Sequence, residues 1–244
     1  MSDAMKVIYI CFPEGKHKVL TMSYDDGKLA DRRLVSIFNH YGIKGTFHLN
    51  SGMHGPERIP SEEWKALYEG HEMSCHTVTH PTIARSPVEQ VAVQVLEDRR
   101  YIERIAGYPV RGFSYPNGSY NREIIELLPK LGIEYSRIVG NTDDFSMPEN
   151  YLAWEATCHH NHNLIENGKR FLELKKTQYM YMMYVWGHSY EFDRDNNWEL
   201  MEEFCEMMSG QEDIWYATNI QIVDYMKAAK NLRFTLDGDL VYNP

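Results

Sequence analysis

The amino-acid sequence predicts an α/β fold, a single barrel in which β-strands alternate with helices. Four segments with helical character each end at a glycine that is followed by a short apolar run. These glycines stand where a helix C-terminus needs a left-handed backbone, and they are Gly42, Gly70, Gly107 and Gly132. Their spacings of 28, 37 and 25 residues suit successive strand–helix units. Such alternation implies a mostly parallel sheet, and no Gly-rich phosphate loop points to the dinucleotide-binding version.

The first elements follow from local signals. A hairpin is expected around residues 14–18, before a first strand that ends within the stretch TMSYDDG at 21–27. Apolar residues at helical spacing predict a helix that reaches Tyr41. Ser61 is expected to cap the next helix.

The later elements complete the barrel. Ser86 opens a capping box with a proline in the first turn, and Asn121 is expected to cap the helix after it. Further apolar runs bring the strand count to seven or eight, and they lie at 152–157, 180–187 and 214–218. No linker interrupts this series, so we expect one domain over 1–244.

Composition excludes several classes of partner. The net charge is −10, from 25 basic and 35 acidic side chains, and no cluster of Lys and Arg is present. Nucleic acid and an anionic membrane surface are therefore not expected as partners. The four cysteines lie far apart, which suggests reduced thiols. With no signal-peptide pattern and no apolar run of membrane-spanning length, the expected location is the cytoplasm.

The chemistry of the chain is expected at the ends of its strands, where barrels place their functional residues. Asp25 and Asp26 stand side by side after the first strand, and such a pair is costly to bury unless a cation lies beside it. His76 and His80 follow a later strand. Two imidazoles, one carboxylate and an open position make a catalytic zinc set, and the second aspartate could then act as general base.

Three motifs resemble the polysaccharide deacetylases, the fourth carbohydrate-esterase family with the NodB homology domain. SYDDG at 23–27 is similar to TFDDG, HTVTH at 76–80 to H-[ST]-x-x-H, and WGHS at 186–189 to the late histidine motif. The resemblance covers about residues 19–225. It implies a distorted (β/α)7 barrel and a metal-dependent hydrolase that removes an N-acetyl or O-acetyl group from a sugar or oligosaccharide.

The resemblance also implies roles. Asp25 would be the base that acts on a metal-activated water, and His188 would be the general acid. The ligands of one divalent metal, zinc with cobalt or nickel as alternatives, would be Asp26, His76 and His80.

Two departures from the family pattern stand out. The family commonly has F-R-P-P-Y-G, whereas this chain has FSYPNG at 113–118, so Ser114 replaces the arginine that steadies the catalytic aspartate. Asn117 replaces the tyrosine, but its backbone N–H could still stabilise an oxyanion, and we place Tyr115 with the substrate residues. Arg137 is either a substitute for the missing arginine or a surface salt-bridge partner. The family's D-x-x-D-W motif has only the fragment 143–145 as its nearest match.

Other polar and aromatic residues are assigned to the substrate. The run CHHNHN at 158–163 is expected to form a loop on the active face. There His159 or His160 would contact a sugar hydroxyl, and a second metal is not expected. Trp186 is expected to offer a stacking face.

Two rival functions stay open. The same site could cleave a small non-sugar amide or cyclic imide. Loss of the motif arginine also allows a catalytically silent carbohydrate-binding barrel, although both acids and all three motif histidines are kept.

Overall fold

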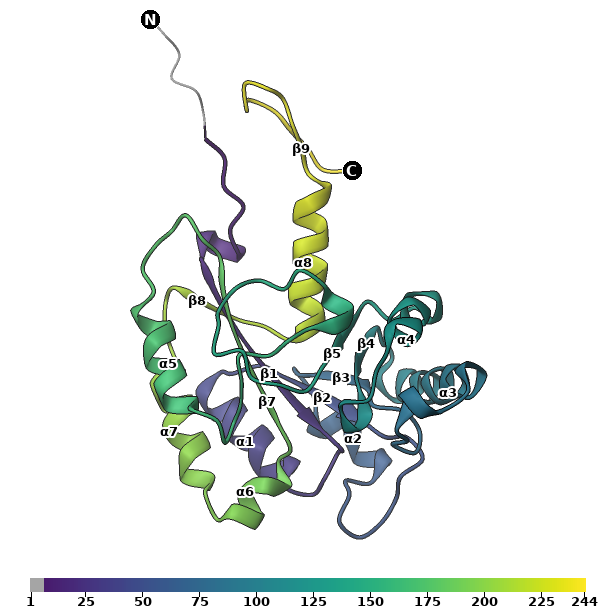
Figure 1. Ribbon diagram of the computed structural model, residues 1–244. Helices are drawn as coiled ribbons and strands as arrows, with labels where there is room; N and C mark the ends of the chain where they lie inside the picture. Colours follow the sequence, from purple (N-terminus) through teal and green to yellow (C-terminus); the bar gives the residue numbers. More distant parts are fainter. Residues whose placement is uncertain (1–6) are drawn as a thin grey trace, which may run out of the picture.

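The computed structural model describes residues 7–244, and its centre is one curved sheet (Figure 1). Its eight strands pair in parallel, in the order β5-β4-β3-β2-β1-β7-β6 with β8 beside β1. The strands are β1 (Lys18–Asp25), β2 (Gly45–Leu49), β3 (Glu72–Cys75), β4 (Gly112–Ser114), β5 (Tyr135–Arg137), β6 (Cys158–His159), β7 (Tyr181–Gly187) and β8 (Ile214–Tyr216). The predicted barrel of seven or eight strands is confirmed as a distorted half-barrel.

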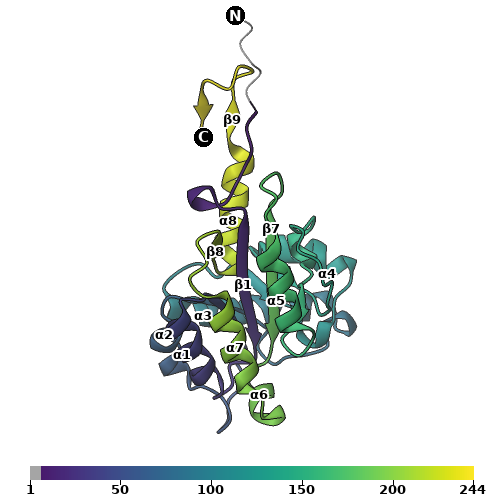
Figure 2. The same cartoon turned by 90° about the vertical axis from the view of Figure 1, so that its left-hand side faces the viewer.

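Helices surround this sheet on the outside (Figures 1 and 2). They are α1 (Asp31–Tyr41), α2 (Ser61–Leu67), α3 (Val88–Ala106), α4 (Arg122–Leu127), α5 (Leu164–Glu173), α6 (Tyr190–Asp195), α7 (Trp198–Met208) and α8 (Asn219–Asn231). A short antiparallel pair, β9 (Arg233–Phe234) and β10 (Val241–Tyr242), follows α8. No helix among the residues that the structure describes has the length and apolar character to cross a membrane.

Strand β1 is buried along its whole length and runs through the centre of the molecule (Figure 2). It pairs with β7 on one side, and on the other with β8 along its first half and with β2 along its second. Because side chains alternate along a strand, Leu20, Met22 and Tyr24 join the apolar core. The residues between them meet polar partners, such as Ser23 with His48 at 3.0 Å. The stretch TMSYDDG therefore has a polar inner face and ends at the carboxyl edge of the sheet.

The gap between the edge strands β5 and β6 is closed by an irregular segment. Ile138 N donates to Trp154 O at 3.0 Å, and Trp154 N donates to Ser136 O at 2.9 Å. The prediction of a strand over 152–157 is wrong, because a 3₁₀ turn occupies Tyr151–Ala153 and β6 begins only at Cys158. The run is apolar because Trp154 fills the core beside Tyr135, and not because it forms a regular ladder.

Most helix-end signals are confirmed, and two start signals are wrong. Gly42, Gly107 and Gly132 each follow a helix with φ between 69° and 78°. Gly70, with φ 80°, lies two residues beyond the cap of α2. Asn121 caps α4 by accepting from Ile124 N at 3.0 Å.

The side chains of Ser61 and Ser86 cap no helix, because α2 and α3 are each preceded by a proline at the cap position. The expected hairpin at 14–18 is only a tight turn. It has one antiparallel bridge, between Phe12 and Lys16.

Candidate catalytic and metal site

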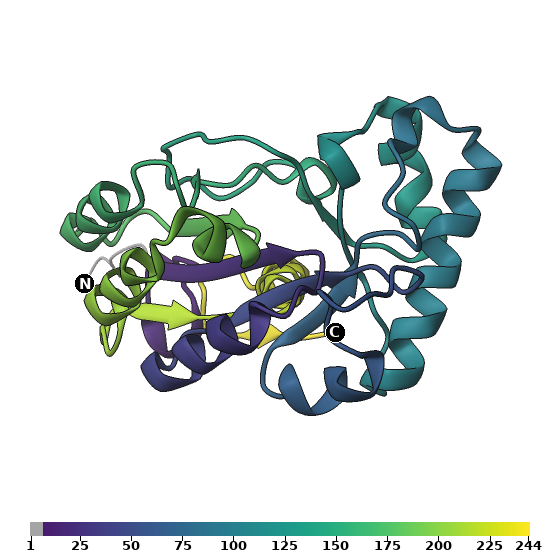
Figure 3. The same ribbon diagram turned by 90° about the horizontal axis from the view of Figure 1, so that it is seen from below.

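Asp25, the last residue of β1, lies buried at the carboxyl ends of the strands, the face seen in Figure 3. The guanidinium of Arg137 donates to its Oδ2, and Ser114 Oγ donates to its Oδ1 at 3.1 Å. Burial alone would raise the pKa of Asp25, but Arg137, helped by His76, outweighs burial and holds the pKa below its usual range. The carboxylate is therefore ionised, which is the form that a general base needs.

Arg137 stands directly beside the position of the missing motif arginine. Ser114 on β4 and Arg137 on β5 are register partners in the sheet, so the guanidinium reaches Asp25 from the neighbouring strand. The Trp186 ring covers the guanidinium at 4.4 Å, and Arg137 is only 1% exposed. The interpretation of Arg137 as a surface salt-bridge partner is wrong.

Asp26, His76 and His80, here called the metal trio, offer ligand atoms that all lie within 4.8 Å of one another. Asp26 Oδ1 lies 3.8 Å from His80 Nε2, and the two imidazole rings are 4.8 Å apart. Asp26 and His80 both adopt a left-handed backbone, with φ of 83° and 55°. Such conformations cost about 1–3 kcal/mol each outside glycine and concentrate at functional sites.

The chemistry of His76 suits a metal ligand. Burial lowers the pKa of His76 to about 4, although the charge of Asp25 acts to raise it, so the ring is neutral. Its Nδ1 lies 2.9 Å from the Ser114 carbonyl oxygen and 2.6 Å from Ser114 Oγ. With the hydrogen on Nδ1 donated to that carbonyl, Nε2 keeps its lone pair for a cation.

Three residues that the sequence analysis missed hold the backbone of this site. Asp98 accepts from His76 N at 2.9 Å, Asn50 Nδ2 donates to His76 O at 2.7 Å, and Arg58 donates to Asp26 O. Only Asp98 left a signal in the sequence. It occupies a core position of α3 in line with Val95, where an apolar residue is expected.

His188 follows β7 on the same face. Burial alone would lower its pKa, but Glu191 and then the carboxylates of Asp25 and Asp26 outweigh burial and raise it. The raised pKa favours the protonated ring that a general acid needs. Glu191 Oε2 lies 3.4 Å from His188 Nδ1.

The structure gives the remaining predicted residues different surroundings. Tyr115 is buried and donates its hydroxyl to Leu152 O at 2.7 Å, so its side chain has no surface for a substrate, contrary to expectation. Asn117 is exposed, with φ 56°. Trp186 is largely buried and donates Nε1 to Gly140 O at 2.9 Å, so the ring serves mainly to cover Arg137.

His159 and His160 meet Glu191, and these three residues are here called the second cluster. Their ligand atoms also lie within 4.8 Å of one another. His160 is fully buried and cannot contact a sugar, which corrects that part of the prediction, whereas His159 is partly exposed. Burial lowers the pKa of His160 to about 3, so its ring is neutral.

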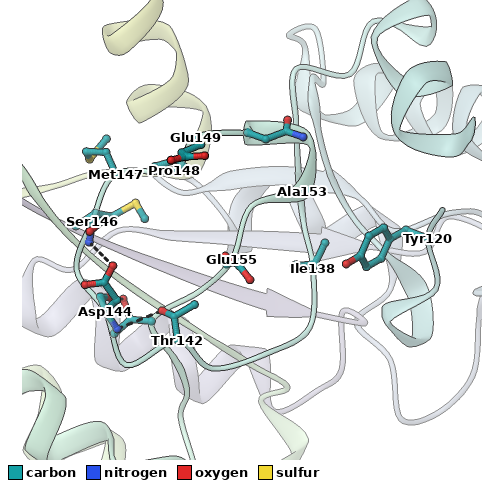
Figure 4. A pocket seen from close by; sticks show the side chains of 13 residues that line it. Tyr120, Ile138, Thr142, Asp144, Ser146, Met147, Pro148, Glu149, Ala153 and Glu155 are labelled. Atoms are coloured by element: carbon teal, nitrogen blue, oxygen red, sulfur yellow. Dashed lines mark hydrogen bonds between the residues drawn. The ribbon is translucent and has the colours of Figure 1, made fainter. Parts of the chain in front are cut away.

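A pocket of about 570 Å³ lies outside this site, along the connection between β5 and β6 (Figure 4). Asp144 and Glu155 are among its lining residues. Asp143 bonds instead to His162 at 2.9 Å and to Asn167 at 2.7 Å. Asp143, in the nearest fragment of the D-x-x-D-W motif, thus makes local hydrogen bonds around this loop.

A buried carboxylate beside two histidines and a second carboxylate, at the carboxyl edge of a βα barrel, defines the class of metal-dependent hydrolases. The family model described as Polysaccharide deacetylase matches residues 12–136, and the chain belongs to this family. Deacetylases of this family depend on a metal.

One curated relative is a chitooligosaccharide deacetylase from Azorhizobium caulinodans, which is 27% identical over 127 residues. This match covers 52% of the chain and 55% of the relative, and the chain spans about half the length of such relatives or less.

Two solved structures show the same fold. A candidate polysaccharide deacetylase from Mycobacterium smegmatis has a TM-score of 0.67 at 16% identity, with 91% of this chain and 94% of that chain covered. A family 4 acetyl xylan esterase from Clostridium thermocellum, in complex with cobalt, has a TM-score of 0.58 at 13% identity and covers 86% and 91%.

Proposed function

We propose that the chain is a metal-dependent deacetylase that removes an acetyl group from an N-acetylated or O-acetylated sugar or oligosaccharide. The observation that carries the proposal is the ionised Asp25, which is paired with Arg137 and lies beside the metal trio. The curated relatives that act on chitooligosaccharide and peptidoglycan support the choice of a sugar substrate.

The metal trio would hold the cation, and its donor set of two imidazoles and one carboxylate suits zinc, with cobalt and nickel as alternatives. When bound there, the metal would act as a Lewis acid toward the substrate carbonyl and would make water more acidic.

The chain's own residues would carry the protons. Asp25 would accept a proton from the attacking water, since its carboxylate is ionised and held in place. His188 would donate a proton to the leaving nitrogen or oxygen of the sugar. The exposed backbone turn at Asn117 would present an N–H to the developing oxyanion.

The test is acetate release by metal-stripped protein and by the same protein reloaded with zinc, cobalt or nickel. N-acetylated chito-oligosaccharides, acetylated xylan and a cyclic imide would be compared, with Asp25→Asn as the matched control. Metal-dependent acetate release from a sugar, absent in Asp25→Asn, is the expected result. Turnover of the imide alone would favour the amidohydrolase, and carbohydrate binding without any turnover would favour the silent barrel.

A further inference from the structure

We propose that the second cluster, His159, His160 and Glu191, binds another divalent cation of the zinc class. This site is separate from the metal trio and does not depend on the proposed deacetylase activity.

The sheet brings these three side chains together. His159 ends β6 and is the register partner of Trp186 in β7, and His160 N donates to Trp186 O at 2.9 Å. Glu191 lies four residues beyond the end of β7, in the first turn of α6. The two neighbouring strand ends thus present two imidazoles and one carboxylate to a common point.

The distances suit a shared cation. Glu191 Oε2 lies 2.9 Å from His159 Nε2 and 3.4 Å from His160 Nε2. Ligands of a tetrahedral zinc ion at its usual bond lengths are about 3.3 Å apart, whereas all the ligand atoms of the cluster lie within 4.8 Å of one another, so the side chains must shift to bind the ion. His188 Nδ1 lies 3.4 Å from the same oxygen, so Glu191 also contacts the ring that is proposed as the general acid.

His160 gives independent evidence for a ligand. The ring is fully buried, and it stacks against Phe192 at 4.1 Å and Tyr24 at 5.8 Å. Neither of its nitrogens has a hydrogen-bond partner among residues 7–244. A buried polar group without a partner costs about 1–3 kcal/mol. A cation bound at Nε2, which already faces Glu191, would remove that cost for one of the two nitrogens.

Binding has a cost at His159. Its Nδ1 accepts from Asn161 N at 3.1 Å, so the hydrogen of the neutral ring is on Nε2. To bind a cation through Nε2, the ring must move that hydrogen to Nδ1, which breaks the bond from Asn161 N and the bond that Nε2 donates to Glu191. These two losses cost about 1–3 kcal/mol each. Arg194 Nη1 also lies 3.6 Å from Glu191 Oε1, but its side chain is exposed and well screened.

The free energy gained on binding zinc exceeds these costs. Apparent binding free energies of four-ligand zinc-finger sites are about 10–16 kcal/mol, so a weaker three-ligand site can still outweigh the two lost hydrogen bonds. Two imidazoles select zinc, cobalt, nickel or copper, whereas magnesium and calcium prefer oxygen ligands.

The experiment measures bound zinc per chain after metal stripping and dialysis of the full chain against micromolar zinc. Two equivalents are expected for the wild type and one for His80→Ala, which disables the metal trio. One equivalent is also expected for Glu191→Gln and for His160→Phe, which keeps the aromatic stacking. His162→Gln is the matched control, because His162 belongs to the same histidine run but bonds to Asp143, and it should keep both equivalents.

Cobalt uptake by the His80→Ala variant gives a second measurement, since any tetrahedral cobalt absorbance there must come from the second cluster. The proposal is overturned if wild type binds one zinc that Glu191→Gln keeps. It is equally overturned if a second zinc survives both Glu191→Gln and His160→Phe. One zinc that is lost in Glu191→Gln and kept in His80→Ala would support the second cluster and would count against the metal trio.

Discussion

Replacing Arg137 by methionine should destabilise the fold strongly. The substitution keeps much of the side-chain length but removes the charge that compensates Asp25. The two side chains are 0% and 4% exposed, so solvent screens the pair little. Breaking a buried ion pair by removing one partner typically costs about 3–5 kcal/mol, and we expect a loss of that size in the free energy of unfolding.

The size of this loss should depend on pH. In the wild type the pKa of Asp25 is lowered, so its contribution to stability is present above the unfolded pKa and is lost as pH falls. In Arg137→Met, burial dominates and raises that pKa, so the variant gains relative stability as Asp25 takes up a proton. The gain of the variant narrows the gap in unfolding free energy between the two proteins as pH falls from neutral toward about pH 4, and the loss in the wild type narrows it further below about pH 4.

The assay is urea unfolding of both proteins over this pH range. Arg111→Met is the matched control, because Arg111 pairs with Asp224 and Glu134 at the surface and such pairs contribute about 0–1 kcal/mol. The double variant Asp25→Asn/Arg137→Met removes both charges and should recover part of the loss. A cost for Arg137→Met below about 1 kcal/mol, or a gap that stays constant with pH, would refute the reasoning.

Three further predictions follow from the site and its supports. His188→Ala should keep the metal of the metal trio and should lose more activity on amides than on activated esters, whose leaving groups need no proton. Equal losses in kcat on both substrates would contradict the role of His188 as general acid. Asp98→Asn loosens the backbone of His76 and should weaken zinc binding by about 10–100-fold in a competition titration with a chelator, whereas unchanged affinity would exclude a supporting role. Burial raises the pKa of Glu72 from 4.5 to about 7, so its stabilising contribution is present below about pH 4.5 and is lost as pH rises toward 7. Glu72→Gln should therefore flatten the fall in unfolding free energy over that window in urea titrations, and an unchanged slope would contradict the assignment.

The fold was predictable from the sequence because its signals are local. Glycine at a helix C-terminus and an aspartate pair at the end of an apolar strand act within a few residues, so Gly42 and Asp25 could be placed correctly. The run at 152–157 was misread because an apolar sequence does not distinguish a ladder strand from a segment that only fills the core, as Trp154 does.

Other parts of the site depend on long-range contacts that spacing does not show. Arg137 and Asp25 are 112 residues apart, and only the register of β4 and β5 places the guanidinium beside Ser114. Arg58 acts through the backbone of Asp26, a contact that leaves no pattern in the sequence. Glu191 is an ordinary acid in a helix until the ends of β6 and β7 bring three imidazoles around it.

The most direct test of the proposed site measures metal content and turnover on the same samples of Asp25→Asn and Asp26→Ala. The metal of the trio should stay in Asp25→Asn while turnover falls by about 10²–10⁴-fold, the usual contribution of a general base. Asp26→Ala should lose that metal and its turnover together. Loss of the metal in Asp25→Asn with retention in Asp26→Ala would reverse the two roles, and full turnover in Asp25→Asn would contradict the general base altogether.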